Sequence, residues 1–404
     1  MENQIRLGVI GIGNMGSAHA KKVFEGQCPD FVLTAVADNN ADRLDWCKET
    51  FGENVARFAD ADSMLDSGLI DACIVAVPHY DHPKYAMDCM RRGIHVLVEK
   101  PAGVYTKQVR EMNAEAAKHP DLVFGLMFNQ RTNHIYRKIR ELVASGKYGQ
   151  IRRTNWIITN WYRPQAYYDS GAWRATWSGE GGGVLLNQCP HQLDLWQWMC
   201  GMPVKVHAHM HYGKWHDIEV EDDVTAYVEY ANGATGVFIT TTGDACGTNR
   251  LEIQLDKAKI VAENNTLSVK EFEMSEPEFS RTNTSPFGSP KTVDVDVETD
   301  GLNSQHVGVI NAWGGAILRG EPLVAAGEEG INGLMLSNAM HLSSWLGKAV
   351  ELPFDEDLYE QELNKRIATS RRKTEVKAVV ADTEGSYGST PITGEYKQRW
   401  NTNW

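Results

Sequence analysis

The first third of the chain alternates short apolar runs with longer, helix-like stretches. The apolar runs are nearly continuous in Val, Ile, Leu and Ala, and they lie at Ile5–Ile10, Phe31–Ala37, Ile70–Val77, His95–Val98 and Leu122–Phe128. Runs of this kind are typical of parallel strands that helices cover on both faces. The alternation predicts an α/β fold, with a doubly wound parallel sheet over residues 1–130.

The pattern changes after residue 130. An amphipathic helix with Ile135, Ile139, Leu142 and Val143 on one face is expected to end at Gly146. Longer, more alternating runs follow at Arg152–Trp161, Lys205–His211, Val224–Tyr230, Ala234–Thr242, Asn249–Gln254, Lys259–Ala262 and Thr266–Glu271. They predict a C-terminal α+β domain over residues 131–372 with a large, mostly antiparallel open sheet. One face packs on helices, and the other is free to pair with a second copy in a homo-oligomer.

Two segments are more polar than the rest. Residues Glu276–Asn303 are rich in Ser, Thr, Pro and Asp, and we expect a mobile excursion there. Residues 373–404 form a polar C-terminal tail that is expected to wrap a neighbour or remain loose.

A glycine-rich turn directly follows the first predicted strand and reads Gly11-Ile12-Gly13-Asn14-Met15-Gly16. Glycines at these positions allow a tight turn, close approach of a pyrophosphate and close packing of the next helix. Asp38 ends the next apolar run, 22 residues after Gly16, where a carboxylate accepts from a ribose hydroxyl and repels a 2′-phosphate. The two features predict a Rossmann sheet that binds NAD in preference to NADP. Arg43 lies near Asp38 in the sequence and leaves NADP as the alternative.

Other polar residues follow the carboxyl ends of later strands in the same predicted sheet. They are Pro78, His79, His82, Glu99 and Lys100. Strand ends of this kind meet in one crevice, so we expect all five residues beside the cofactor. Lys100, which precedes Pro101, would place a reactive amine there.

A second group of residues lies around three consecutive glycines, Gly181 to Gly183. We expect these glycines to let the backbone approach the nicotinamide end of the cofactor. A helix would then place Asn187, His191 and Asp194 on one face, with Asn187 as its N-cap. An imidazole suits proton abstraction at neutral pH, and a neighbouring carboxylate can orient it.

The segment before these glycines is crowded with aromatic residues and arginines. We expect substrate contacts from Trp161, Arg163, Tyr168, Trp173 and Arg174, together with Tyr136 from the preceding helix. Aromatic rings cover the apolar faces of pyranoses, and arginine tips bond hydroxyls, so carbohydrate is the expected substrate. The alternative is that several of these residues fill the core between the domains.

With these motifs in view, the chain resembles the Gfo/Idh/MocA oxidoreductases from about residue 5 to about residue 370. The glycine turn, Glu99-Lys100-Pro101, the triple glycine and His191-x-x-Asp194 carry the resemblance. It implies that Lys100 and His191 are catalytic and that the Lys100–Pro101 bond is cis. Many members have an aspartate four residues before the histidine. Here Asn187 cannot take a proton, so acid–base work would fall on His191 and Lys100. Asn187 and Asp194 would then hold neighbouring hydroxyls of the substrate.

The expected reaction is NAD-dependent oxidation of a secondary hydroxyl on a sugar, glycoside or C-glycoside. The motif Asn-Gln-x-Pro-His at residues 187–191 resembles a branch of the family whose members oxidise the glucosyl C3 hydroxyl. The resemblance favours C3 as the position of oxidation. The alternatives are an inositol or polyol dehydrogenase and a redox-neutral enzyme that keeps its NAD while cleaving a glycoside. A non-catalytic NAD-binding sensor is disfavoured, because a sensor has no need of a lysine and histidine pair.

Charge and composition narrow the partners. The formal net charge is −13 and no block of consecutive Lys or Arg occurs, which argues against nucleic acid and anionic membranes. No apolar stretch is long enough to span a bilayer and no signal-like start is present, so we expect a cytoplasmic protein. His207, His209 and His211 share a strand face with zinc-like spacing, but hydride transfer needs no metal and none is expected.

Overall fold

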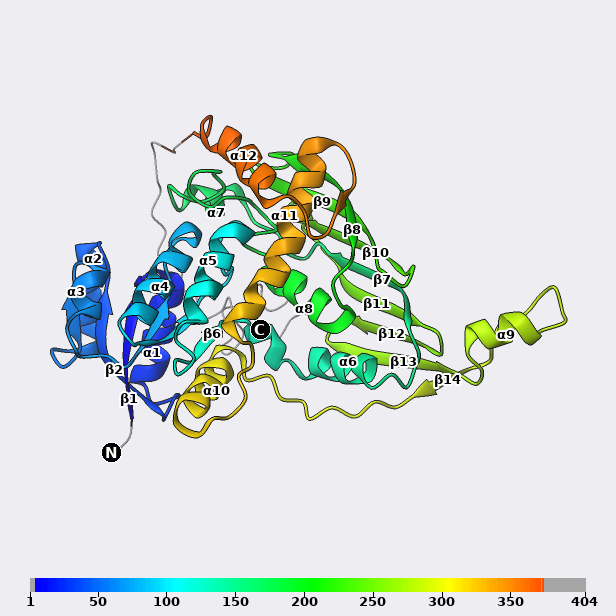
Figure 1. Cartoon of the computed structure of the whole chain (residues 1–404), viewed down its shortest axis with the longest axis horizontal. Coiled ribbons are helices and arrows are strands. Elements are labelled where there is room, and N and C mark those ends of the chain that lie inside the picture. Colours follow the sequence, from blue (N-terminus) through cyan, green and yellow to red (C-terminus); the bar gives the residue numbers. More distant parts are fainter. Residues whose placement is uncertain (1–3, 372, 374–404) are drawn as a thin grey trace.

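The computed structural model describes residues 4–371 and 373, which form two units side by side, each built on its own sheet (Figure 1). The N-terminal sheet is entirely parallel, in the order β3-β2-β1-β4-β5-β6. Its strands are β1 (Ile5–Ile10), β2 (Phe31–Ala37), β3 (Ala56–Phe58), β4 (Ala72–Val75), β5 (His95–Val98) and β6 (Phe124–Leu126). The order reverses between β1 and β4, so the crevice opens beyond the carboxyl ends of these strands.

The doubly wound prediction is confirmed, with small differences in length. Helices α1 (Asn14–Phe24), α2 (Ala41–Phe51), α3 (Ala61–Leu65), α4 (His82–Arg91) and α5 (Thr106–Ala116) connect the strands. The predicted runs at Ile70–Val77 and Leu122–Phe128 are longer than the strands β4 and β6 that the structure has there. Strand β3 was not predicted, since its three residues are partly exposed and carry no continuous apolar run.

The C-terminal sheet has nine strands in the order β14-β13-β12-β11-β7-β10-β9-β8-β15, and only β7 and β10 run parallel. The central strands are β7 (Ile151–Ile158), β8 (Lys205–Tyr212), β9 (Glu221–Glu229), β10 (Thr235–Thr241), β11 (Asn249–Leu255), β12 (Ala258–Glu263) and β13 (Thr266–Phe272). The short edge strands are β14 (Thr292–Val295) and β15 (Val350–Glu351). The predicted large, mostly antiparallel sheet is therefore confirmed.

One face of this sheet packs on helices and the other faces outward. Helices α6 (His134–Ala144), α8 (Pro190–Cys200) and α11 (Gly330–Leu346) cover the inner face, where Trp156 and Phe238 are fully buried. Helix α11 also contacts α5, and so lies between the two units (Figure 1). On the outer face the alternate residues Asn155 and Ile157 remain accessible. The helix expected at Ile135–Val143 is α6.

Helix α10 (Gln305–Arg319) returns from the C-terminal half of the chain to the N-terminal sheet. Trp313 stacks on Phe31 with 5.2 Å between the ring centroids, and Val309 and Ile310 join the same buried cluster as β1 and β2. A division of the chain at residue 130 therefore leaves part of the N-terminal core in the second half of the sequence.

The segment expected to be an irregular excursion contains regular structure. Helix α9 (Glu276–Thr282) leads into β14, which pairs antiparallel with β13. The alternation of Val293 and Val295 provided a strand signal that the polar composition obscured. In Figure 1 helix α9 projects away from the body of the molecule, beyond the ends of β13 and β14.

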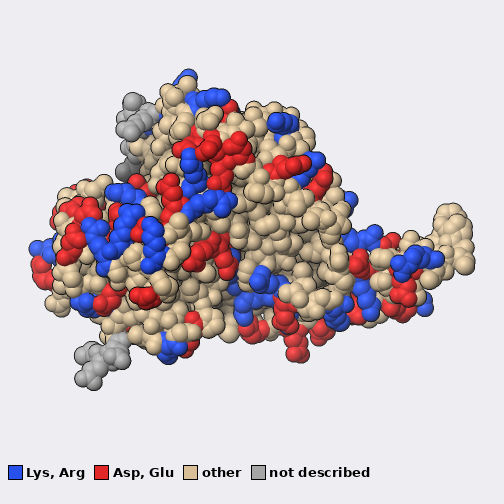
Figure 2. Space-filling model, in the orientation of Figure 1, with Lys and Arg blue, Asp and Glu red and all other residues tan. Residues whose placement is uncertain are grey.

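The remaining elements close the chain. Helix α7 (Gln165–Asp169) lies in the aromatic segment, and α12 (Glu356–Ile367) ends shortly before the last described residues. The tail over 373–404 lies outside the described residues, apart from Lys373. In the described part of the chain no helix is long and apolar enough to cross a bilayer. Basic and acidic side chains are interspersed on the face that Figure 2 shows.

Candidate active site

The glycine turn after β1 forms a cradle with one open position. Gly11 has φ of +87°, and a Cβ on it would lie 2.5 Å from the Ala76 carbonyl oxygen. A Cβ on Gly16 would lie 1.8 Å from the Gly11 carbonyl oxygen, whereas one on Gly13 would meet nothing within 4 Å. The first turn of α1 carries no acidic residue. The geometry fits a pyrophosphate that approaches Gly13 at the N-terminus of α1.

Asp38 lies at the end of β2, against this turn. Its Oδ2 accepts from the Ile12 backbone N–H at 2.6 Å, and its Oδ1 accepts from the Asn40 backbone N–H at 2.8 Å. These bonds fix a negative charge at the edge of the cradle. The position fits a carboxylate beside the ribose of a dinucleotide.

His82 was expected beside the cofactor, but both of its ring nitrogens are engaged inside the protein. They lie 2.6 Å from the Pro101 carbonyl oxygen and 2.8 Å from the Val77 carbonyl oxygen. Burial lowers the pKa of His82, and the two carbonyls oppose that effect. His82 therefore joins the turn after β4 to the turn after β5, which corrects the expected contact with cofactor.

Glu99 is likewise turned inward. Its Oε1 lies 2.6 Å from Nε2 of the buried His19, and its Oε2 accepts from the Lys100 backbone N–H at 3.0 Å. Burial alone would raise the pKa of Glu99, but His19 and Lys100 lower it overall. Glu99 therefore anchors the backbone of the next residue, and the expected direct contact with cofactor is corrected.

Lys100 follows β5 and precedes a cis peptide bond to Pro101, as the resemblance implied. Its Nζ donates to the backbone carbonyl oxygen of Asn187 at 2.9 Å. Burial is the main cause that lowers the pKa of Lys100, while the charges of Glu99 and Glu180 raise it. A lowered amine pKa suits a group that exchanges protons near neutral pH.

His191 lies in the first turn of α8, which places the imidazole at the junction of the two units. It is only 3% exposed, its ring meets the edge of Phe128, and its Nδ1 has no hydrogen-bond partner among the described residues. Burial, and then the charge of Lys100, hold the pKa of His191 well below its usual value. The imidazole is therefore neutral at pH 7 and able to accept a proton.

Asp194 does not face the same space. Its Oδ1 and Oδ2 accept from Nη2 and Nε of Arg131 at 2.7 and 2.8 Å, and Gln197 donates to Oδ1 at 3.1 Å. The carboxylate is fully buried. This arrangement corrects the expectation that Asp194 holds substrate hydroxyls or orients His191, because Arg131 already occupies both oxygens.

Asn187 precedes α8, whose N-cap is Cys189, so the expected N-cap role is wrong. Its Oδ1 accepts from the Tyr167 hydroxyl at 3.2 Å, and its Nδ2 donates to Oε1 of Glu180. Together with the bond from Lys100, these contacts make Asn187 one of the points where the two units meet. Neither Tyr167, in the aromatic segment, nor Glu180, which directly precedes the triple glycine, was among the predicted site residues.

The triple glycine is packed against protein atoms. A Cβ on Gly181 would lie 2.2 Å from Val104, and one on Gly183 would lie 2.0 Å from the Glu221 carbonyl oxygen. A Cβ on Gly182 would lie 2.8 Å from Leu186. The glycines therefore allow close packing within the protein, and the approach of their backbone to nicotinamide stays a prediction.

Part of the aromatic segment faces the crevice. Arg174 donates from Nη1 to the Tyr167 hydroxyl at 2.8 Å, and its guanidinium lies over the rings of Tyr167 and Trp173. Trp173 in turn meets His79, which follows β4, edge to face at 5.6 Å. Arg163 lies over Tyr167 and Trp161. These half-buried side chains span from the C-terminal unit to the cofactor side.

Other residues that were expected to contact substrate pack inside the protein. Tyr168 is buried and donates to the Thr242 hydroxyl at 2.7 Å, and Tyr136 packs on Trp156 within the core of the C-terminal unit. The expected substrate contacts of Tyr168 and Tyr136 are corrected accordingly. Trp161 is 7% exposed, so little of its ring reaches solvent.

His306 is a site residue that sequence reasoning missed. It lies at the start of α10, its ring centroid is 5.4 Å from that of His19, and it is close enough to His191 and Lys100 for their charges to lower its pKa. Burial is the largest cause of that shift. No local motif marks this residue, because only the return of α10 brings it to the crevice.

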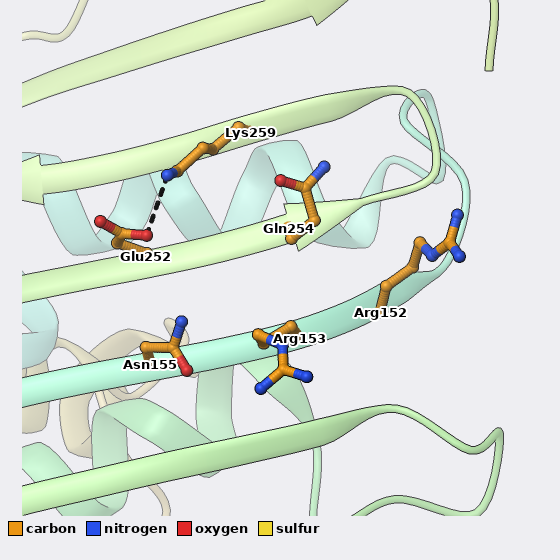
Figure 3. Close-up of a pocket in the computed structure, with 6 residues that line it drawn as sticks. All are labelled: Arg152, Arg153, Asn155, Glu252, Gln254 and Lys259. Atoms are coloured by element: carbon orange, nitrogen blue, oxygen red, sulfur yellow. Dashed lines mark ion pairs between the residues drawn. The ribbon is translucent and has the colours of Figure 1, made fainter. Parts of the chain in front are cut away.

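The outer face of the C-terminal sheet holds a separate feature. A hollow of about 450 Å³ lies over β7, β11 and β12, where Glu252 and Lys259 form an ion pair at 2.9 Å (Figure 3). Its lining residues are Arg152, Arg153, Asn155, Glu252, Gln254 and Lys259. His207 and His209 lie on the same face. Among the described residues no group of three metal-ligating side chains could hold a metal ion.

Comparison with known proteins identifies the class. A family profile described as "Oxidoreductase family, NAD-binding Rossmann fold" matches residues 5–125, and one described as "GFO/IDH/MocA C-terminal domain" matches residues 136–261. The chain is thus an oxidoreductase with an NAD(P)-binding Rossmann domain. It belongs to the Gfo/Idh/MocA family.

Relatives of several specificities align with the chain. The myo-inositol 2-dehydrogenase of Thermotoga maritima is 26% identical over 64% of this chain and 75% of its own length. The D-glucoside 3-dehydrogenase of Escherichia coli is 26% identical over 57% of this chain and 68% of its own length. The structure of the WlbA dehydrogenase from Chromobacterium violaceum with NADH and UDP-GlcNAcA has a TM-score of 0.73 and 26% identity, over 88% of this chain and 98% of that one.

Proposed function

We propose that this protein is an NAD-dependent dehydrogenase that oxidises a secondary hydroxyl of a sugar or glycoside. The observation that carries the proposal is the position of Lys100 and the neutral His191, which come from different units and lie near each other where the two units meet. The favoured position is C3 of a glucosyl unit, which the similarity to a D-glucoside 3-dehydrogenase supports. The alternative, an inositol or polyol, is supported by the similarity to a myo-inositol 2-dehydrogenase.

The side chains divide the chemistry between them. The His191 imidazole accepts the proton of the substrate hydroxyl, since it is neutral at pH 7. The Lys100 ammonium stabilises the alkoxide that develops as the proton leaves, and its lowered pKa lets it donate or take a proton in turn. A bound nicotinamide supplies the two-electron acceptor.

Substrate and cofactor would be held by different groups. Tyr167, Trp173, Arg163 and Arg174 form an aromatic and cationic wall on which a pyranose ring can stack. Gly11, Gly13 and Gly16 with the N-terminus of α1 would hold the pyrophosphate, and Asp38 the adenosine ribose. Ile12, Asn14, Met15 and Pro78 complete this lining. The fixed charge of Asp38 favours NAD over NADP.

The test is formation of NADH, followed by absorbance, when purified protein and NAD meet a panel of aryl glucosides, C-glucosides, free aldoses and inositols. Turnover of glucosides that yields a 3-keto product supports the favoured reading, and turnover of inositols alone supports the polyol alternative. A cleaved glycoside without net NADH would instead indicate the redox-neutral reaction. No reduction and no cleavage with any member would contradict the proposal.

A further inference from the structure

Glu180 is a buried carboxylate of the site that has no role in the reaction described above. It is 2% exposed and stands in the turn before the triple glycine. Its Oε2 accepts from the Ala175 backbone N–H at 2.5 Å, and its Oε1 accepts from the Asn187 side-chain amide. Both N–H groups, together with the charge of Arg174, favour the ionised form, whereas burial raises the pKa of Glu180 above its ordinary value.

The charge of Glu180 acts on cations of the site. It interacts with the Arg174 guanidinium, and it favours the protonated form of the Lys100 amine. The charged and titratable groups that face Glu180 from neighbouring segments are Lys100, His79, Tyr168, Arg174, Glu221 and Lys373.

Asn187 links Glu180 to the lysine. The Asn187 amide can satisfy both neighbours only in one orientation, with Nδ2 toward Glu180 and Oδ1 toward the Tyr167 hydroxyl. That orientation fixes residue 187 and with it the backbone carbonyl that accepts from Lys100 Nζ. An aspartate at position 187 would put two carboxylates against each other, so the amide at this position depends on Glu180.

We propose that Glu180 is a positioning residue that acts through Asn187 to hold the Lys100 amine in place and protonated before the reaction. The inference rests on the proposed function, because that function makes the amine of Lys100 a catalytic group. It also explains why an asparagine occupies position 187. The two residues act as one hydrogen-bonded pair, with the carboxylate at position 180 and the amide at position 187.

Four variants separate the geometry from the charge. Glu180→Gln keeps the shape and removes the charge, and Glu180→Ala removes both. Asn187→Asp opposes two carboxylates, whereas Glu180→Gln with Asn187→Asp restores one carboxylate and one amide with their positions exchanged. The control is Glu115→Gln, which also removes a buried carboxylate but at the far end of α5, where Glu115 pairs with Lys118 and Arg91.

The first measurement needs no substrate. The rate at which an amine-reactive reagent labels Lys100 is followed by mass spectrometry across a pH series, which gives the ionisation of the amine directly. We expect Glu180→Gln to move the labelling midpoint to lower pH by on the order of one unit, because a nearby negative charge is lost. Glu115→Gln should leave the midpoint unchanged. An unchanged midpoint in Glu180→Gln would overturn the proposal.

The second measurement uses the substrate found by the NADH assay. Asn187→Asp is expected to lower kcat about a hundredfold with KM changed less than threefold, and the exchanged double variant to recover at least tenfold. If the effects of Glu180→Gln and Asn187→Asp on kcat simply multiply in the double variant, the proposed pairing of the two residues is overturned. If no substrate is oxidised by the wild-type protein, the proposed function fails, while a shifted labelling midpoint would still support the coupling of Glu180 to Lys100.

Discussion

The amine of Lys100 and the backbone carbonyl of Asn187 lie 2.9 Å apart although 87 residues separate them in the chain. The bond joins the strand end of the dinucleotide-binding sheet to the turn before α8. It therefore sets the distance between the amine and His191, which stands one turn further on. Formation of the site depends on how the two units dock.

Removal of either candidate catalytic group should lower kcat strongly and spare cofactor binding. We expect Lys100→Ala and His191→Ala each to lower kcat by about 10²- to 10⁴-fold, the usual contribution of a positioned acid or base. NADH affinity, measured by fluorescence titration, should change little because neither side chain lies at the glycine cradle. A variant that retains more than a tenth of the wild-type kcat would exclude its residue from the chemistry.

Asp38 should decide between the two nicotinamide cofactors. Asp38→Ala removes the charge that opposes a 2′-phosphate, and we expect the ratio of NAD to NADP affinity to fall at least tenfold. Thermal stabilisation by each cofactor at matched concentration measures this without a substrate. Arg43→Ala is the matched control and should move the ratio the other way, if at all. An unchanged ratio in Asp38→Ala would show that the ribose lies elsewhere.

The buried pair of Arg131 and Asp194 should matter for stability more than for substrate affinity. Asp194→Leu leaves a buried guanidinium with Glu329 as its remaining acidic partner, and the free energy of unfolding should fall by about 3 kcal/mol. Denaturant unfolding followed by circular dichroism measures the loss. The exposed pair of Arg319 and Asp30 serves as control, and Asp30→Asn should leave the midpoint nearly unchanged. A stable Asp194→Leu protein with a raised KM would restore the substrate role.

The protein should lose stability as the pH falls below about 6.5, the ordinary pKa of histidine. The folded protein keeps His79, His82, His191 and His306 neutral, so their pKa values are lower than in the unfolded chain. Below pH 6.5 the unfolded chain therefore binds more protons, and stability decreases with falling pH. Glu180 and Asp194 act in the opposite sense because burial raises their pKa values.

Melting temperatures between pH 8 and pH 5 measure this dependence. We expect the decline between pH 6.5 and pH 5 to be smaller in a His306→Phe protein, which has one fewer buried imidazole to protonate. A melting temperature that stays constant down to pH 5 would show that the buried histidines are protonated without cost.

The outer face of the nine-stranded sheet should join two copies of the chain. Ile157 and Tyr227 are exposed, and each lies beside an apolar residue of β10, Ile239 and Val237. We expect light scattering to give at least a dimer, and Ile157→Lys to shift it toward the monomer. Leu318→Lys, an equally exposed apolar position on α10, is the control. A monomer at assay concentration would refute the pairing.

Local features of the chain could be predicted from the sequence better than the hydrogen-bond partners of individual side chains. Continuous and alternating runs located both sheets, and the glycine turn, Asp38, Lys100 and His191 stand at the crevice as spacing predicted. Side chains whose place depends on distant segments were misassigned. Asp194 bonds to Arg131, and His82 bonds to two backbone carbonyls. In both cases a strong hydrogen-bond partner from a distant segment determines where the side chain points, and the helix face predicted from periodicity does not.

Two further residues could not be found from local pattern. Glu180 has no periodic neighbour that marks it as buried, and its role depends on the orientation of the Asn187 amide. His306 reaches the site only because α10 crosses back to the N-terminal sheet. Contacts of this kind come from tertiary packing, which no local spacing encodes.

The return of α10 also limits how the protein can be divided. A fragment that stops after β6 would lose Trp313 and leave Phe31 exposed on the uncovered face of the sheet. Grafting the dinucleotide-binding part of this chain onto another substrate domain would thus require two pieces of sequence, residues up to β6 and residues 305–319. A chimera joined at one crossover near residue 130 would have to obtain an equivalent helix from its new partner.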